Sequence, residues 1–100
     1  MAEPTYQPIA SVYNQGPTSA KTLIGLGFTA AQIDKCEAAV ITVSTAAVSM
    51  TMDGTTPTAA NGIQLPASLT PLWVYGRELV RNLQFISASG LLNISLMARI

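Results

Sequence analysis

Histidine is absent from the 100 residues, cysteine occurs once, and charged residues make up only 10% of the chain. Without histidine, the chain lacks the commonest general base, the usual zinc ligand and every histidine-dependent catalytic triad. The carboxylates are also few, and Asp34 and Glu37 lie three residues apart, as on a solvated helix face rather than in a catalytic pair. We therefore expect that the chain is not an enzyme and has no catalytic residue, metal site or cofactor.

Further absences limit the kinds of partner. The apolar runs are short, and none approaches the roughly 18–20 residues of a membrane span. The five basic residues are scattered singly, so they form no electrostatic stripe for nucleic acid. The single cysteine, Cys36, cannot form an internal disulfide, which suits assembly in a reducing cytoplasm. We expect protein partners, and we expect no nucleic acid, no membrane and no small-molecule substrate.

The chain combines a high apolar content with very little charge. Hydrophobic residues make up 49% of it, and its formal net charge is zero. A neutral surface lacks the repulsion that keeps copies apart in solution. Either the surface is merely bland, or partner subunits cover much of it. We favour the second interpretation, because large exposed apolar patches are uncommon on monomers.

The first 27 residues differ from the rest, because prolines and glycines interrupt every long element there. One interpretation is a floppy terminus, as many termini are. We favour an extended arm over residues 1–27 that inserts Tyr6, Ile9 and Tyr13 into a neighbouring subunit. The folded domain is then expected over residues 28–100.

One helix is predicted, directly after Thr29. Thr29 is a suitable N-cap, and Gln32 stands at the position that completes a capping box. Phe28 and Ile33 fit the hydrophobic pair that flanks such a cap. The helix is short, and Cys36 is expected to be a buried small apolar residue rather than a reactive thiol.

From Val40 to Ile100 the apolar residues follow a period of two, which is typical of strands. The alternation slips by one residue near Thr45, so the chain must turn or bulge there. Glycine and proline turns separate the segments. These features predict a mainly β fold, a small antiparallel β-sandwich or barrel with one short α-helix and an extended N-terminal arm. The expected strands cover residues 40–44, 48–52, 63–65, 72–75, 79–86 and 92–100.

Trp73, Tyr75 and Arg77 alternate on one side of an expected strand. Aromatic side chains spaced in this way can stack on sugar rings. They can equally fill a core or a contact between subunits, where aromatic residues are enriched, and we favour this alternative. The predicted interface residues are therefore Tyr6, Tyr13, Trp73, Tyr75 and Arg77.

The stretch from Ala39 to Ile100 resembles small capsid-associated proteins of tailed bacteriophages, of the cement or decoration type. The resemblance is carried by ITVSTAAVSMT at residues 41–51, DGTTPTA at 53–59, GIQLP at 62–66 and RNLQFISASG at 81–90. It implies a β-sandwich subunit that assembles, often as a trimer, on or near a phage capsid or its neck. The predicted helix and the first 27 residues carry no part of the resemblance.

The hypothesis from sequence is a capsid cement or decoration protein at the surface of the virion, assembled in the host cytoplasm. It is expected to bridge subunits of the major capsid protein and to contact copies of itself, a homotrimer being one arrangement. A connector or tail adaptor is an alternative within the same class, distinguished by a lower copy number per virion. A glycan- or receptor-binding module that uses Trp73 and Tyr75 is an alternative from another class.

Overall fold

The computed structural model describes residues 5–67 and 71–99, and within them the chain folds into two four-stranded antiparallel sheets. Sheet A has the strand order β1 (Tyr6–Gln15), β8 (Leu91–Arg99), β3 (Ala38–Ser44), β6 (Leu72–Tyr75). Sheet B has the order β2 (Lys21–Thr22), β7 (Gln84–Ile86), β4 (Val48–Thr51), β5 (Ile63–Leu65). The predicted mainly β, antiparallel sandwich is confirmed.

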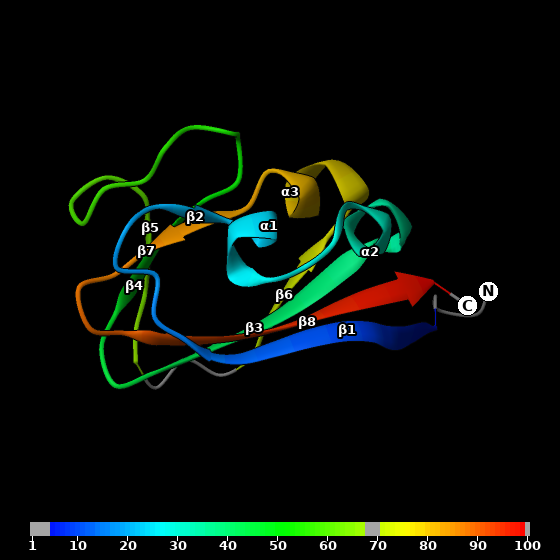
Figure 1. The fold of residues 1–100 in the computed structure, drawn as a ribbon, viewed down its shortest axis with the longest axis horizontal. Helices are drawn as coiled ribbons and strands as arrows, with labels where there is room; N and C mark the ends of the chain where they lie inside the picture. The colour runs from blue at the N-terminus through cyan, green and yellow to red at the C-terminus, as the bar shows by residue number, and fades with distance from the viewer. Residues whose placement is uncertain (1–4, 68–70, 100) are drawn as a thin grey trace.

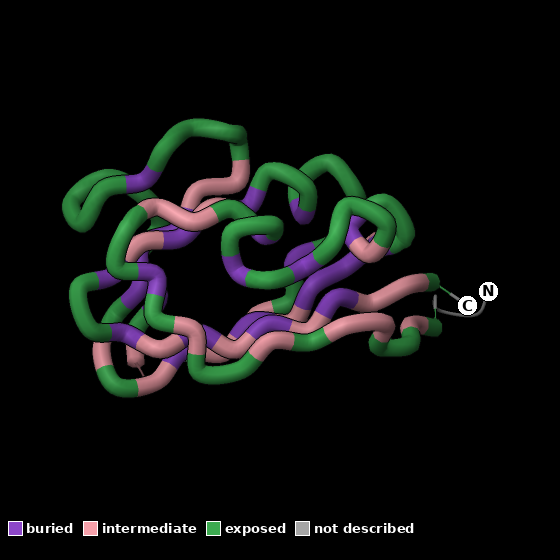
Figure 2. The backbone as a smooth tube through the Cα atoms, in the orientation of Figure 1, coloured by how far each residue is buried: buried purple, intermediate pink, exposed green. Residues whose placement is uncertain are grey.

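Sheet B and the helices lie on the same side of sheet A, as Figure 1 shows. The strands of sheet A bury alternate residues toward that side: Ala39, Ile41 and Val43 of β3 are buried, whereas the residues between them are partly exposed. Buried residues follow the middle strands β3 and β8 and continue into sheet B (Figure 2). Burial of this apolar surface is the main stabilising contribution to the fold. The largest fully buried side chains include Phe85, Leu23, Ile41, Met50, Leu83, Leu92, Ile94 and Leu96.

The helix predicted after Thr29 is α2 (Ala30–Lys35), and its capping box is complete. The Thr29 hydroxyl accepts a hydrogen bond from the Gln32 amide at 3.2 Å, and the Gln32 side chain accepts one from the Thr29 amide at 2.9 Å. Phe28 and Ile33 are both buried beside this cap. The prediction of a single helix is wrong, because the described chain also contains α1 (Leu23–Leu26) and α3 (Arg77–Arg81).

Helix α3 replaces the first part of the strand predicted over residues 79–86. Gly76 has a φ of +103°, a backbone conformation that glycine adopts readily, and the chain turns there from β6 into the helix. Val80 is buried three residues before the buried Leu83, whereas Leu79 is 44% exposed. A spacing of three suits a helical turn better than a strand. The strand character is confirmed only for Gln84–Ile86, which forms β7.

The slip in the alternation near Thr45 is where the chain leaves sheet A for sheet B. Thr45 has a φ of +75°, so the backbone reverses between β3 and β4. The turn between β7 and β8 packs against this reversal, since the Ser87 hydroxyl donates to the Ala47 carbonyl at 2.7 Å. Gly90 completes the contact: a Cβ there would lie 2.5 Å from the Ala46 carbonyl oxygen. The connection from β3 to β4 and the connection from β7 to β8, which both cross between the sheets, therefore pack tightly against each other.

The N-terminal segment is extended over Tyr6–Gln15, as expected, but it pairs with β8 of its own chain as an edge strand of sheet A. Pro8 is tolerated because an edge strand need not donate from every amide, and the register shifts between Pro8 and Ala10. Leu23 and Leu26 belong to the core, so the expected boundary at residue 27 falls inside the packed unit. Insertion of Tyr6, Ile9 and Tyr13 into a neighbouring subunit stays a prediction.

The final strand follows the expected alternation: Leu92, Ile94 and Leu96 are buried, and the residues between them are partly exposed. Residues 1–4, 68–70 and 100 lie outside the described part of the chain, and Ile100, the last residue of the predicted strand, is among them.

Candidate functional site

An aromatic cluster of Tyr6, Trp73 and Tyr75 lies on the outer face of sheet A, the face turned away from sheet B. The Trp73 and Tyr75 rings stack with centroids 5.7 Å apart and an interplanar angle of 12°. The Tyr6 ring is tilted against both, with its centroid 6.1 Å from Trp73 and 5.9 Å from Tyr75. Three of the five predicted interface residues therefore come together.

The strand pairing explains how these rings reach one another. Trp73 and Tyr75 are two residues apart on β6, so they share a face of the sheet. Tyr6 is on β1, at the opposite edge, about 14 Å away across three strand spacings. Tyr6 pairs with Arg99, which is exposed and belongs to the outward set of β8. The aromatic rings thus extend toward each other over the two middle strands.

Beneath the aromatic cluster the sheet carries a small residue. Ala38 of β3 lies opposite Tyr75 on one side and opposite Met97 on the other, and opposed residues in antiparallel strands share a face. Ala38 is 0% exposed although it points outward. We infer that the rings close over it. Aromatic pairs of this kind contribute about 0.5–1.5 kcal/mol beyond the area they bury.

The aromatic cluster is covered on its inner side but open to solvent. Trp73 is 38% exposed and Tyr75 is 55% exposed. Large aromatic side chains that are held in place by their neighbours and still exposed are typical of interface anchors. The rings are therefore held in place, and a molecule that packed on them would cost little further rotamer freedom.

Arg77, the fourth predicted residue, does not join the cluster. It is the first residue of α3 and forms an ion pair at 3.7 Å with Glu37, which directly precedes β3. Both side chains are more than a third exposed, so the pair contributes little to stability. Arg77 therefore contacts a charged residue rather than the aromatic rings.

Tyr13, the fifth predicted residue, is on β1 and is 64% exposed. It makes no aromatic pair among the described residues. Its position near the far end of the edge strand separates it from the cluster. The structure therefore does not connect Tyr13 with the other aromatic residues.

Charge is distributed unevenly over the molecule. The four strands of sheet A carry one charged residue, Arg99, within their described ranges. Near α2 and α3, by contrast, Arg81 lies 2.8 Å from Asp34 and 3.6 Å from Glu78. The outer face of sheet A is thus nearly free of charge, which suits a surface that is desolvated against a partner.

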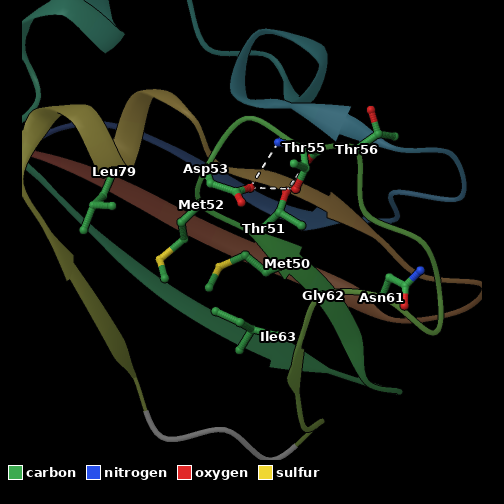
Figure 3. Close-up of a pocket in the computed structure, with 10 residues that line it drawn as sticks. All are labelled: Met50, Thr51, Met52, Asp53, Thr55, Thr56, Asn61, Gly62, Ile63 and Leu79. Carbon is green, nitrogen blue, oxygen red and sulfur yellow. Dashed lines mark hydrogen bonds between the residues drawn. The ribbon is translucent and has the colours of Figure 1, made fainter.

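A second surface feature is a cavity of about 640 Å³ beside β4, β5 and α3. Met50, Met52, Ile63 and Leu79 point toward it in Figure 3. Its polar side is the turn after β4, where Asp53 accepts hydrogen bonds from the Thr55 amide at 3.1 Å and hydroxyl at 2.6 Å. These bonds hold the pKa of Asp53 below its ordinary value.

The cavity has the shape of a binding pocket but not the chemistry of an active site. Asp53 is committed to its own turn, and the remaining polar residues that line the cavity are threonines and an asparagine. Neither a nucleophile paired with a base nor a pair of carboxylates lies among the lining residues. These residues share no local sequence signal, because only the fold places Leu79 and Ile63 in the lining of one cavity.

Cys36 is fully buried, as predicted. Burial raises the pKa of its thiol, which donates a hydrogen bond to the Ile33 carbonyl at 3.0 Å. Over residues 5–67 and 71–99, no group of three or more His, Cys, Asp or Glu side chains is placed to hold a metal ion. Nor does any helix in those ranges have the length and apolar character needed to cross a membrane.

Sequence reasoning named Tyr6, Trp73 and Tyr75 but not their contact. Tyr6 and Trp73 are far apart in the chain, and they meet only because β1 and β6 flank the same two middle strands. The one local signal was the spacing of two between Trp73 and Tyr75, which places both on one face. Comparison with protein-family models, with curated proteins and with solved structures finds no match to this chain.

Proposed function

We propose that this chain is a structural assembly protein that binds a partner protein through the outer face of sheet A. The observation that carries the proposal is the aromatic cluster, in which Trp73 and Tyr75 are stacked, held by Tyr6 and still exposed. Interfaces derive most of their binding energy from a few such aromatic anchors.

The proposed setting is the head of a tailed phage, where the chain acts as a cement or decoration protein that bridges capsid subunits. The resemblance over Ala39–Ile100 supports this setting. A nearly uncharged outer face and a net charge of zero fit a protein that is covered in its working state. A connector or tail adaptor would use the same face at a lower copy number.

The test is binding of purified protein to phage capsids that lack it, measured by co-sedimentation. Trp73→Ala is expected to weaken binding by roughly tenfold or more, because anchor residues typically contribute over 1.4 kcal/mol. Ile24→Ala is the control, since it removes an exposed large apolar side chain from α1, which lies on the other side of sheet A. Equal binding of wild type and Trp73→Ala, with both folded by circular dichroism, would contradict the proposal.

A glycan-binding module is the second candidate, and the exposed stack of Trp73 on Tyr75 favours it. Sugar rings pack on the face of an aromatic ring, so this function needs one ring face open. A glycan-array screen distinguishes the two functions. Binding to a sugar that is lost in Trp73→Ala, while capsid binding is unchanged, would support the glycan module instead.

A further inference from the structure

We propose that two copies of this chain pair through the exposed edge of β6, joining their A sheets into one continuous sheet across a twofold axis. The inference rests on the proposed function, because it names a partner for the strand that carries Trp73 and Tyr75. The contact between the two copies uses the backbone of β6, whereas the proposed capsid contact uses the side chains on the outer face of sheet A.

The directions of the amide and carbonyl groups of β6 determine which kind of chain segment can pair with this edge. Register pairs Tyr75 with Ala38 and Val74 with Ala39, and the Gly76 amide donates to the Glu37 carbonyl at 2.9 Å. Hydrogen-bonded and non-hydrogen-bonded pairs alternate along an antiparallel ladder. Val74 therefore directs its amide and carbonyl toward β3, and Trp73 and Tyr75 direct theirs away from the sheet. Only another extended strand matches that spacing of donors and acceptors.

The described edges differ in how well they are protected against such pairing. Edge strands are normally kept unpaired by shortness, proline, bulges or charge. In sheet A, β1 has Pro8 and two shifts of register. In sheet B, β2 has two residues and β5 has three. Strand β6 has four residues, Leu72–Tyr75, with a regular register and neither proline nor charge. It is the unprotected edge.

The sequence of β6 is self-complementary about Val74. In an antiparallel pair centred there, Trp73 lies opposite Tyr75 of the partner subunit, and the reverse pair follows by symmetry. Among the described residues, none pairs with the backbone groups of Trp73 and Tyr75 on this side, so the pair gains about four main-chain hydrogen bonds. The Trp73 and Tyr75 side chains of both copies then form one row on the outer face, and cross-strand aromatic pairs are favourable. No charged side chain lies on either β6 to oppose the contact.

The direct test uses the purified full chain without any capsid. Sedimentation over a concentration series is expected to show the mass rising from 10.5 kDa toward twice that value. Hydrogen exchange by NMR over the same series should slow at the amides of Trp73 and Tyr75 by roughly tenfold or more as the dimer forms. The Val74 amide, already bonded to β3, is the internal control and should not change.

A chain that remains monomeric up to ~1 mM, where even a weak interface assembles, would overturn the inference. A dimer in which the Trp73 and Tyr75 amides still exchange at monomer rates would overturn it equally. Slowing of those two amides with concentration supports it. This readout needs no substitution, so it does not depend on how well a variant folds.

Two variants separate this edge contact from binding through the outer face. Tyr75→Pro removes an amide donor from the open edge and should weaken the dimer at least tenfold, whereas Tyr75→Phe keeps the donor and should dimerise as wild type does. Tyr6→Ala removes a ring of the cluster without touching β6. It should lower capsid binding and leave the dimer intact. If Tyr6→Ala binds capsids normally while the dimer persists, the proposed function fails and the edge pairing stands.

Discussion

Sheet A and sheet B are built from the same chain but hold together in different ways. Sheet A has long strands, ten residues in β1 and nine in β8, and its outer face carries exposed aromatic rings. Strands in sheet B have two to four residues. Its outer side is small and polar, and the side chains of Ser49, Gln64 and Ser87 bond to one another or to nearby carbonyls.

The difference shows how a chain of 100 residues can combine a packed core with an exposed aromatic surface. Sheet B is short and satisfies its polar groups internally, and no buried side-chain nitrogen or oxygen lacks a partner in the described chain. It serves mainly to cover sheet A. Sheet A is therefore free to expose apolar rings on the other side, because its inner face is already packed. This difference between the packed inner side and the exposed outer side of sheet A can be tested with variants on each side.

The largest effect is expected where the two sheets meet. Phe85 of β7 is 0% exposed and packs in the core between them. Phe85→Ala should lower the free energy of unfolding by about 3–5 kcal/mol, because it removes buried area and leaves a cavity. Urea denaturation measures this. Trp73→Ala is the comparison, and it should cost less than half as much. Equal losses would contradict the division between a packed side and a binding side.

A smaller loss is expected at the crossings between the sheets. In Gly90→Ala the new Cβ would lie 2.5 Å from the Ala46 carbonyl oxygen and 2.7 Å from the Ser87 hydroxyl. The two turns must move apart, which should cost about 1–3 kcal/mol. Gly16→Ala is the matched control, since its nearest neighbour would be 3.7 Å away. If both variants have the same denaturation midpoint, the crossings are not tightly packed.

A substitution at the cap of helix α2 should lower the free energy of unfolding less than the two substitutions above. Thr29→Ala removes the hydroxyl of the α2 capping box, and the expected loss is about 1 kcal/mol in urea denaturation. Thr18→Ala removes an exposed threonine whose side chain has no hydrogen bond within the described residues. A loss as large in Thr18→Ala would show that the cap itself is not the cause.

The smallest effect concerns the turn after β4. The folded pKa of Asp53 lies below its ordinary value of 3.8, because the Thr55 hydroxyl and amide donate to the carboxylate. A lowered pKa means that the contribution to stability is present above the unfolded pKa and is lost as the pH falls through the folded pKa. The Thr55 amide signal in NMR should therefore titrate with a midpoint below 3.8. Asp53→Asn should abolish the titration, and a midpoint above the ordinary value would contradict the assignment.

The fold was predictable where local patterns decide it. Alternation identified β8 and capping chemistry identified α2, and the slip near Thr45 predicted the turn at which the chain crosses between the sheets. The prediction failed over residues 79–81, where a strand was expected although Val80 and Leu83, which are both buried, have the spacing of three that suits a helical turn. Proline and glycine content suggested a separate arm, but β1 pairs with β8 because an edge strand tolerates Pro8.

The candidate site was only half predictable. Trp73 and Tyr75 stand two apart, so their shared face follows from the sequence. Their contact with Tyr6 depends on the strand order of sheet A, which local periodicity does not contain. The open backbone of β6 depends on the same order, since a strand is an edge only with respect to its sheet.

Trp73 is the single tryptophan of the chain, so it can report directly on the face that is proposed to bind. Protein labelled with 5-fluorotryptophan would be mixed with unlabelled capsids, and the fluorine signal would be followed by NMR together with its solvent isotope shift. If the outer face of sheet A binds the capsid, the signal should move and the isotope shift should fall, because the ring is desolvated in the complex. An unchanged signal in protein that sediments with the capsids would contradict binding through the outer face of sheet A.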